Sequence, residues 1–179
     1  MSHGYLICPA ISDQNGAEGS CNASKNFNQR VGFLPWAELG IPKLDSWAHL
    51  YRYSVTLAYA INDNTKKNSV TPPTTSDITI ETRNTAGKLF YLSNAIPAVL
   101  MSFGKNAVVG TSNDGILVAN TSASNIDEVA NATDAIGKTF INRNIGENSS
   151  TSGGEFDDLV IWLSPNVYLN RMVAVGQLP

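Results

Sequence analysis

The chain closes with FDDLVIWLSPNVYLNRMVAVGQLP (residues 156–179), and this stretch decides the fold class. Residues 156–163 hold five consecutive apolar residues rich in β-branched and aromatic types, which predicts a central strand covered on both faces. Ser164 and Pro165 suit the N-cap and N1 positions of a helix, and the apolar spacing that follows predicts a helix over 165–175. The end of the chain is therefore predicted to pair a buried strand directly with a helix.

The middle of the chain alternates in the way that β-strands do. In YRYSVTLAY (51–59) the tyrosine, valine and leucine side chains share one face, which predicts a half-buried strand. Residues 78–82 and 88–92 flank turn residues and predict a hairpin, and 96–104 predict a further short, buried strand. Together with the closing strand and helix (156–176), these segments predict an α+β fold: an antiparallel sheet with few short helices.

Two segments are polar and irregular. Residues 4–32 predict an opening loop, and residues 119–154 predict a polar variable region that ends in a glycine- and serine-rich loop. A short helix inside that region, with Ser124 as its N-cap, is predicted by four residues at helical spacing: Ile126, Val129, Ala130 and Thr133.

The composition narrows the class of protein. The 179 residues suit one domain (1–179) with its own core. Charged residues make up 15%, below the roughly 25% of an average soluble domain. The net charge of −3 provides no electrostatic footprint for nucleic acid. No stretch of the sequence reaches the roughly 18 apolar residues of a membrane span.

Two cysteines, Cys8 and Cys21, lie in the opening loop. That segment has too few apolar residues to bury two thiols, so a disulfide is predicted in an oxidising compartment. In a reducing compartment the same two thiols would be bystanders. A zinc site built from these cysteines with His3 and His49 is disfavoured, because the sequence has no C-x-x-C or H-x₃-H pair. No cofactor is predicted.

The opening loop also contains a partial calcium pattern. Asp13, Asn15 and Glu18 place oxygen ligands at intervals around Gly16, as calcium-binding loops do. The pattern lacks an acidic ligand at its far end, so a turn stabilised by Asn and Asp side chains is the simpler interpretation.

Asp157 and Asp158 are the other candidate carboxylates. Adjacent residues on a strand point to opposite faces, whereas paired carboxylate catalysis needs both side chains to converge on one substrate. The pair is therefore interpreted as a charged entry to the closing strand. No catalytic residue is predicted, and the chain is not expected to be an enzyme.

Aromatic residues gather between positions 36 and 53. Trp36, Trp47, Tyr51 and Tyr53 suit either an exposed sugar-binding platform or a buried core. The core is the favoured interpretation, because both tryptophans flank short turn-like segments that need to pack against the rest of the domain.

Three stretches, taken in order, resemble a known family. GYLICP (4–9), GFLPWAELGIPKLDSWAHLYRYSV (32–55) and the closing stretch resemble the globular part of type IV pilin-like proteins of Gram-negative bacteria, which include minor pilins and type II secretion pseudopilins. The family's Gly-x-Leu-Pro-Trp segment and Asp-x-Trp turn are matched by Gly32, Leu34, Pro35, Trp36, Leu39, Gly40, Asp45, Trp47 and Tyr53.

The resemblance has structural implications for individual residues. It implies a motif core of Trp36, Trp47, Tyr53 and Trp162. Ala48 stands where the family usually has glycine, which predicts a turn that avoids positive φ at that residue.

The resemblance also implies a function. The protein would be a structural subunit, a minor pilin or pseudopilin, of a type IV pilus or a type II secretion-like filament. Such a subunit is anchored at the periplasmic face of the inner membrane by an N-terminal apolar helix, which this sequence does not contain. Its partners would be other pilin or pseudopilin subunits, joined by repeated head-to-tail contacts. The alternative is a free-standing secreted binding module or adhesin that recognises a surface or a glycan.

Overall fold

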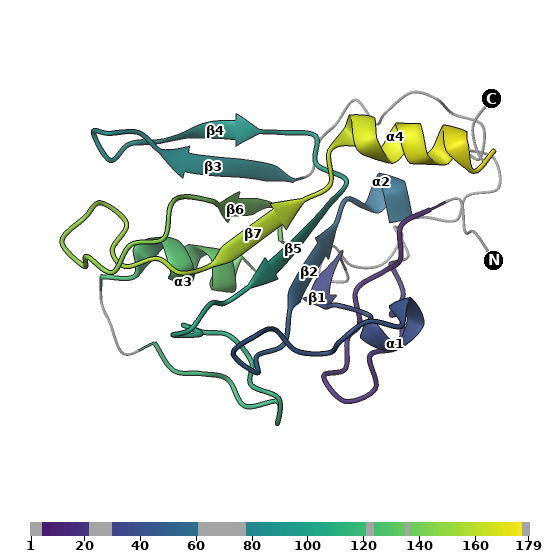
Figure 1. Cartoon of the computed structure of the whole chain (residues 1–179), viewed down its shortest axis with the longest axis horizontal. Coiled ribbons are helices and arrows are strands. Elements are labelled where there is room, and N and C mark those ends of the chain that lie inside the picture. Colours follow the sequence, from purple (N-terminus) through teal and green to yellow (C-terminus); the bar gives the residue numbers. More distant parts are fainter. Residues whose placement is uncertain (1–4, 22–29, 61–77, 121–123, 135–136, 177–179) are drawn as a thin grey trace.

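Two β-sheets enclose the main core of the protein, and short helices lie around them (Figure 1). The computed structural model describes residues 5–21, 30–60, 78–120, 124–134 and 137–176. These ranges contain both sheets and helices in separate segments, so the predicted α+β class is confirmed.

The first sheet has the strand order β1-β2-β5-β7, and every neighbouring pair is antiparallel. Its register aligns Tyr53 with both Gly32 and Leu100, and Leu100 with Ile161. Its strands are β1 (Val31–Phe33), β2 (Arg52–Val55), β5 (Ala98–Ser102) and β7 (Leu159–Trp162).

The second sheet has the order β4-β3-β6. Strands β3 (Thr79–Arg83) and β4 (Leu89–Ser93) form the predicted hairpin, which is confirmed. Strand β6 (Thr139–Ile141) lies parallel to β3, so the sheets are not wholly antiparallel as expected. The polar composition of 119–154 concealed this strand, whose central residue Phe140 is fully buried.

Apolar side chains from both sheets form the main core. Ile80 of β3, Met101 of β5 and Phe140 of β6 have no exposed surface, and Val160 of β7 is also buried. Trp162 packs against this cluster with part of its ring still exposed. The second sheet thus covers one face of the first.

The opening loop covers part of the other face of the first sheet. Cys8 and Cys21 form the predicted disulfide, with a Cα–Cα distance of 5.7 Å, and both are buried against Leu34, Tyr53 and Val55. The predicted loop boundary at residue 32 was wrong, because β1 begins at Val31. Main-chain hydrogen bonds between Ala10 and Phe33 attach the loop to that strand.

Four helices are described: α1 (Trp36–Leu39), α2 (Leu57–Ala60), α3 (Ile126–Thr133) and α4 (Pro165–Ala174). The strand predicted over 51–59 ends at Val55, and α2 follows it. Thr56 ends the strand, because its amide and hydroxyl donate to Pro97 O and Ile96 O, and its carbonyl accepts from Tyr59 N.

The closing strand is an edge strand, and the prediction that it is central was wrong. Within the described chain β7 pairs with β5 alone. Val160 and Trp162 face the core, whereas Ile161 is 65% exposed. A run of apolar residues fixes neither the number of neighbouring strands nor the cover on each face. Helix α4 is confirmed, with Ser164 at its N-cap and Pro165 in its first turn.

The Asp-x-Trp turn also departs from expectation. Ala48 has a φ of 66°, so it takes the left-handed conformation that it was predicted to avoid. Asp45 imposes the turn, since its Oδ1 accepts from Trp47 N and His49 N and its Oδ2 accepts from Ser102 Oγ. Trp47 is 40% exposed, so its assignment to the motif core was wrong, whereas Tyr53 is buried and Trp36 partly so.

Candidate functional site

Helix α3 buries its polar side. Asp127, Glu128 and Asn131 have no exposed surface, whereas Ile126 is 59% exposed. The helix is where it was predicted, but its apolar spacing does not mark the inward face. The N-cap position belongs to Asn125 and not to Ser124, and no side-chain capping hydrogen bond forms there. The overlooked signal is the acid and amide stripe at helical spacing, which resembles a solvated face in sequence.

Asp127 is the centre of a buried ion triad. Arg83 of β3 donates to both carboxylate oxygens, with Nε–Oδ2 2.8 Å and Nη2–Oδ1 2.6 Å, and Arg143 Nε donates to Oδ2 at 2.8 Å. Both guanidiniums also donate to main-chain carbonyls, those of Gly87 and Gly154. The triad therefore ties α3 to the β3–β4 hairpin and to the loop before β7.

Asn131 joins the same helix to β6. Its Oδ1 accepts from Ile141 N at 2.6 Å and its Nδ2 donates to Ile141 O at 3.0 Å. The same Nδ2 lies 2.8 Å from Asp158 Oδ2. The Asn131 carboxamide thus makes the two main-chain hydrogen bonds to Ile141 that a neighbouring strand would otherwise make.

Glu128, Asp157 and Asp158 form an acid cluster. One carboxylate oxygen from each residue can be chosen so that all three lie within 4.8 Å of one another. The prediction that Asp157 and Asp158 diverge was wrong, because β7 begins only at Leu159 and the two residues precede its extended backbone. No sequence motif marks this cluster, since its members come from α3 and from the approach to β7.

Hydrogen bonds fix the cluster in place. Glu128 Oε1 accepts from Asp157 N at 2.7 Å, and both of its oxygens lie 3.1 Å from Asn106 Nδ2. Asn125 Nδ2 donates to Glu128 Oε2 at 2.8 Å. Asp157 Oδ2 accepts from Asn106 N at 2.9 Å. Three separate segments therefore meet at these carboxylates.

Several buried oxygen atoms at the cluster have no hydrogen-bond donor within the described chain. They are Asp157 Oδ1, Asp158 Oδ1 and Asn125 Oδ1. A buried carboxylate or amide oxygen without a partner costs about 1–3 kcal/mol, so the site favours an occupant that supplies positive charge or a proton.

Burial raises the pKa of Glu128 to about 7. Hydrogen bonds from Asp157 N and Asn106 oppose that shift, and the Asp157 charge adds to it. Burial likewise raises the pKa of Asp158 well above its ordinary value; the Asn131 hydrogen bond and Arg143 oppose the shift, while Glu128 and Asp157 reinforce it.

These raised pKa values predict the sign of the stability change with pH. A carboxyl group whose pKa is higher in the folded state binds more protons in that state than in the unfolded state. Its contribution to the free energy of unfolding is therefore full at a pH below its pKa in the unfolded chain, and it is lost as the pH rises through its pKa in the folded protein. EDTA is added so that no metal ion neutralises the carboxylates. Under this condition Glu128 and Asp158 together should lower the free energy of unfolding by roughly 1–3 kcal/mol between about pH 5 and pH 8.

Denaturant unfolding at the two pH values measures this fall. Asp158→Asn keeps an oxygen for Asn131 and removes one of the two raised groups, so the fall should be smaller in this variant. An equal fall in the variant and in the wild type would contradict the assignment of Asp158.

Two side chains of the calcium pattern in the opening loop accept main-chain hydrogen bonds within that loop. Asn15 Oδ1 accepts from Ala17 N, and Glu18 Oε1 accepts from Cys8 N. Gly16 has a φ of 58°, and a Cβ there would lie 2.2 Å from the Trp36 ring, so this glycine is needed for close packing. The turn interpretation therefore holds for this loop.

The zinc hypothesis fails at its cysteines, because Cys8 and Cys21 are joined in the disulfide. His49 lies beside Asp45, with Nδ1 3.9 Å from Oδ1, and His3 lies outside the described residues. The aromatic platform is also not formed by the four proposed residues together. Tyr53 is buried, and its hydroxyl donates to Ile7 O.

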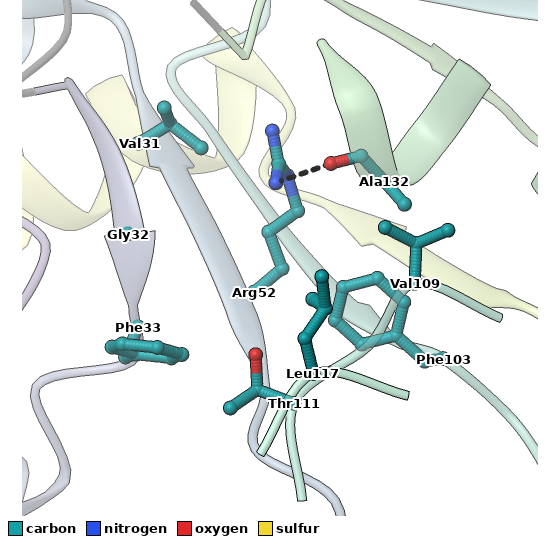
Figure 2. A pocket seen from close by; sticks show the side chains of 9 residues that line it. All are labelled: Val31, Gly32, Phe33, Arg52, Phe103, Val109, Thr111, Leu117 and Ala132. Carbon is teal, nitrogen blue, oxygen red and sulfur yellow. Dashed lines mark hydrogen bonds between the residues drawn. The ribbon is translucent and has the colours of Figure 1, made fainter. Parts of the chain in front are cut away.

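A cleft of about 340 Å³ lies between β1 and the loop that follows β5 (Figure 2). Its walls are mainly apolar and include Phe33, Phe103 and Leu117. The Arg52 guanidinium turns toward the end of α3, where it donates to Ala132 O at 2.9 Å and to Asp134 O. Both terminal nitrogens of the charged side chain of this cleft are thus already engaged, and the acid cluster, with several unpartnered oxygens, is the stronger candidate site.

None of the helices in the described ranges combines the length and the apolar character that crossing a membrane requires. Comparison with protein-family models, with curated proteins and with solved structures gave no match for this chain.

Proposed function

We propose that this protein is a structural subunit of a type IV pilus or a type II secretion-like filament and that it catalyses no reaction. The observation that supports this proposal most directly is an apolar strip on the first sheet, made of Leu100, Leu159 and Ile161. Leu159 and Ile161 are exposed within the described structure, and Leu100 is partly buried beside them.

The strip lies on the face of the sheet opposite the main core. Leu159 and Ile161 alternate with core-facing residues along β7, and Ile161 is the cross-strand partner of Leu100. The opening loop covers this face over Tyr53 and Val55 of β2. Figure 1 shows that loop beside β1 and β2, away from β7. Among the described residues, the β7 end of the strip is therefore the exposed part of this face.

An apolar helix suits such a strip. Contiguous exposed apolar surface marks a contact with another chain or segment. The pilin-like family provides an occupant of matching chemistry, namely the apolar N-terminal helix that anchors the subunit in the inner membrane and packs in the filament core. Under this proposal the partners are other pilin or pseudopilin subunits, and the protein acts at the periplasmic face of the inner membrane or in an extracellular filament.

A matched pair of substitutions tests the proposal in the bacterium that encodes the protein. Ile161→Asp places a charge in the strip, and Ile116→Asp places the same charge on a distant loop at an isoleucine of equal exposure, 65%. We expect Ile161→Asp to prevent incorporation of the protein into filaments, as measured by immunogold electron microscopy of sheared surface fibres. Ile116→Asp should leave incorporation at the wild-type level.

Equal incorporation of both variants would contradict the proposal. Thermal unfolding of the purified variants must give similar melting temperatures, so that a loss of incorporation reflects the surface and not the fold. If no filament contains the wild-type protein and the purified chain gives saturable binding on a glycan array, the secreted binding module replaces the structural subunit.

A further inference from the structure

We propose that the acid cluster of Glu128, Asp157 and Asp158 binds a hard divalent cation, with Ca²⁺ as the preferred ion. This inference does not depend on the filament proposal, because it rests on side chains inside the folded domain.

The spacing of the carboxylates suits a single ion. Ca²⁺ binds oxygen ligands at about 2.3–2.6 Å, so two ligands of one ion lie at most about 5 Å apart. The three carboxylates offer oxygens within 4.8 Å of one another, which meets this limit. The ligands are all oxygen, and this favours Ca²⁺ or Mg²⁺ over ions that prefer histidine or cysteine.

Unpartnered oxygens next to the carboxylates provide a second, separate observation. Asp158 is 2% exposed, and no donor in the described part of the chain reaches its Oδ1, although its Oδ2 is bonded to Asn131. Asn125 is also 2% exposed. Its Nδ2 donates to Glu128 Oε2, so the carboxamide lies against the cluster, and its Oδ1 has no partner among the described residues. A calcium ion uses neutral amide oxygens of this kind together with carboxylates.

The local charge also favours a cation. Asp127 already occupies Arg83 and the Nε of Arg143, and Arg52 donates to the carbonyls at the end of α3. Within the described residues the acid cluster makes no direct ion pair with these three guanidiniums, although the charges of Arg52 and Arg143 act on Asp158. The cluster brings together two buried carboxylates, those of Glu128 and Asp158, and the half-buried carboxylate of Asp157. Buried carboxylates in this arrangement repel one another unless a cation or a proton neutralises part of the charge.

An ion at this site would join three parts of the chain. Glu128 comes from α3, Asp157 and Asp158 precede β7, and Asn106 binds the cluster from the loop after β5. Ca²⁺ would therefore stabilise the attachment of α3 to the first sheet, because β5 and β7 are neighbours there.

Calorimetry on the whole chain tests the proposal. After treatment with EDTA and its removal, the protein is titrated with CaCl₂, and separately with MgCl₂, near pH 8. We expect saturable Ca²⁺ binding near one ion per chain. Differential scanning should show a rise in the melting temperature of about 5 °C or more when free Ca²⁺ exceeds its Kd by about 100-fold. Binding of Mg²⁺ alone would overturn the choice of ion, and no binding of either ion would overturn the site.

Three variants locate the ion. Asp157→Asn and Asp158→Asn keep the shape of each side chain and remove a charge, so each should lower Ca²⁺ affinity at least 10-fold. Glu147→Gln removes an exposed acid outside the cluster and should bind as the wild type does. Asp158→Asn should also raise the melting temperature of the ion-free protein, a gain that a misfolded variant cannot show. Unchanged Ca²⁺ affinity in both cluster variants would overturn the proposal.

Discussion

Replacing Asp127 by alanine is expected to lower the free energy of unfolding by about 3–5 kcal/mol. The carboxylate is fully buried and binds Arg83 and Arg143, whose side chains are themselves mostly buried. Its removal leaves two guanidiniums that have lost their anion, and this costs more than the ion pairs contribute in an intact triad. Gly153 packs tightly here too, since a Cβ on it would lie 2.0 Å from Asp127 Oδ2.

Urea unfolding followed by circular dichroism measures this loss. The control is Asp114→Ala, which removes an exposed aspartate from the turn before Gly115 and should change stability by less than about 0.5 kcal/mol. A loss below about 1 kcal/mol for Asp127→Ala would show that the triad is open to water in solution.

Replacing Phe140 by alanine is expected to cost about 3–5 kcal/mol. Phe140 has no exposed surface and lies in the main core between the two sheets. The substitution removes the transfer free energy of the ring and leaves a cavity that the flanking strands cannot fill without moving.

Phe90 of β4 provides the matched control, because it lies in the same sheet and almost half of its surface is exposed. Phe90→Ala should therefore cost clearly less than Phe140→Ala in the same unfolding assay. Equal losses would mean that the polar region around β6 does not complete the core.

Local patterns in the sequence predicted the elements that depend on near neighbours. The hairpin β3–β4, strand β5 and helices α3 and α4 follow from alternation, turn residues and helical spacing over a few positions. The disulfide followed from the poverty of apolar residues around Cys8 and Cys21. These local signals do not depend on the order in which the strands pair within a sheet.

The errors concern contacts between distant segments. The apolar run 159–163 is compatible with either a central or an edge strand. Its position in the sheet depends on which other strands pair with it, and the run itself carries no information about them. Glu128 and Asn131 looked solvated, because acids and amides on a helix are usually exposed. They are buried only because Asp157 N, Asn106 and Ile141 arrive from elsewhere in the chain to bond them. Sequence reasoning therefore missed the acid cluster as a whole.

The bonds between α3 and β6 have a consequence for how the second sheet meets its surroundings. Within the described structure β6 is the last strand of that sheet, and its outward amides at Thr139 and Ile141 would ordinarily be open to another chain. Asp134 Oδ2 accepts from the first, and Asn131 accepts from the second. Both outward amides of this edge strand are therefore already hydrogen-bonded to side chains. A strand from another chain would find no free N–H donor at either position. These two amides should exchange with deuterium as slowly as those of an interior strand.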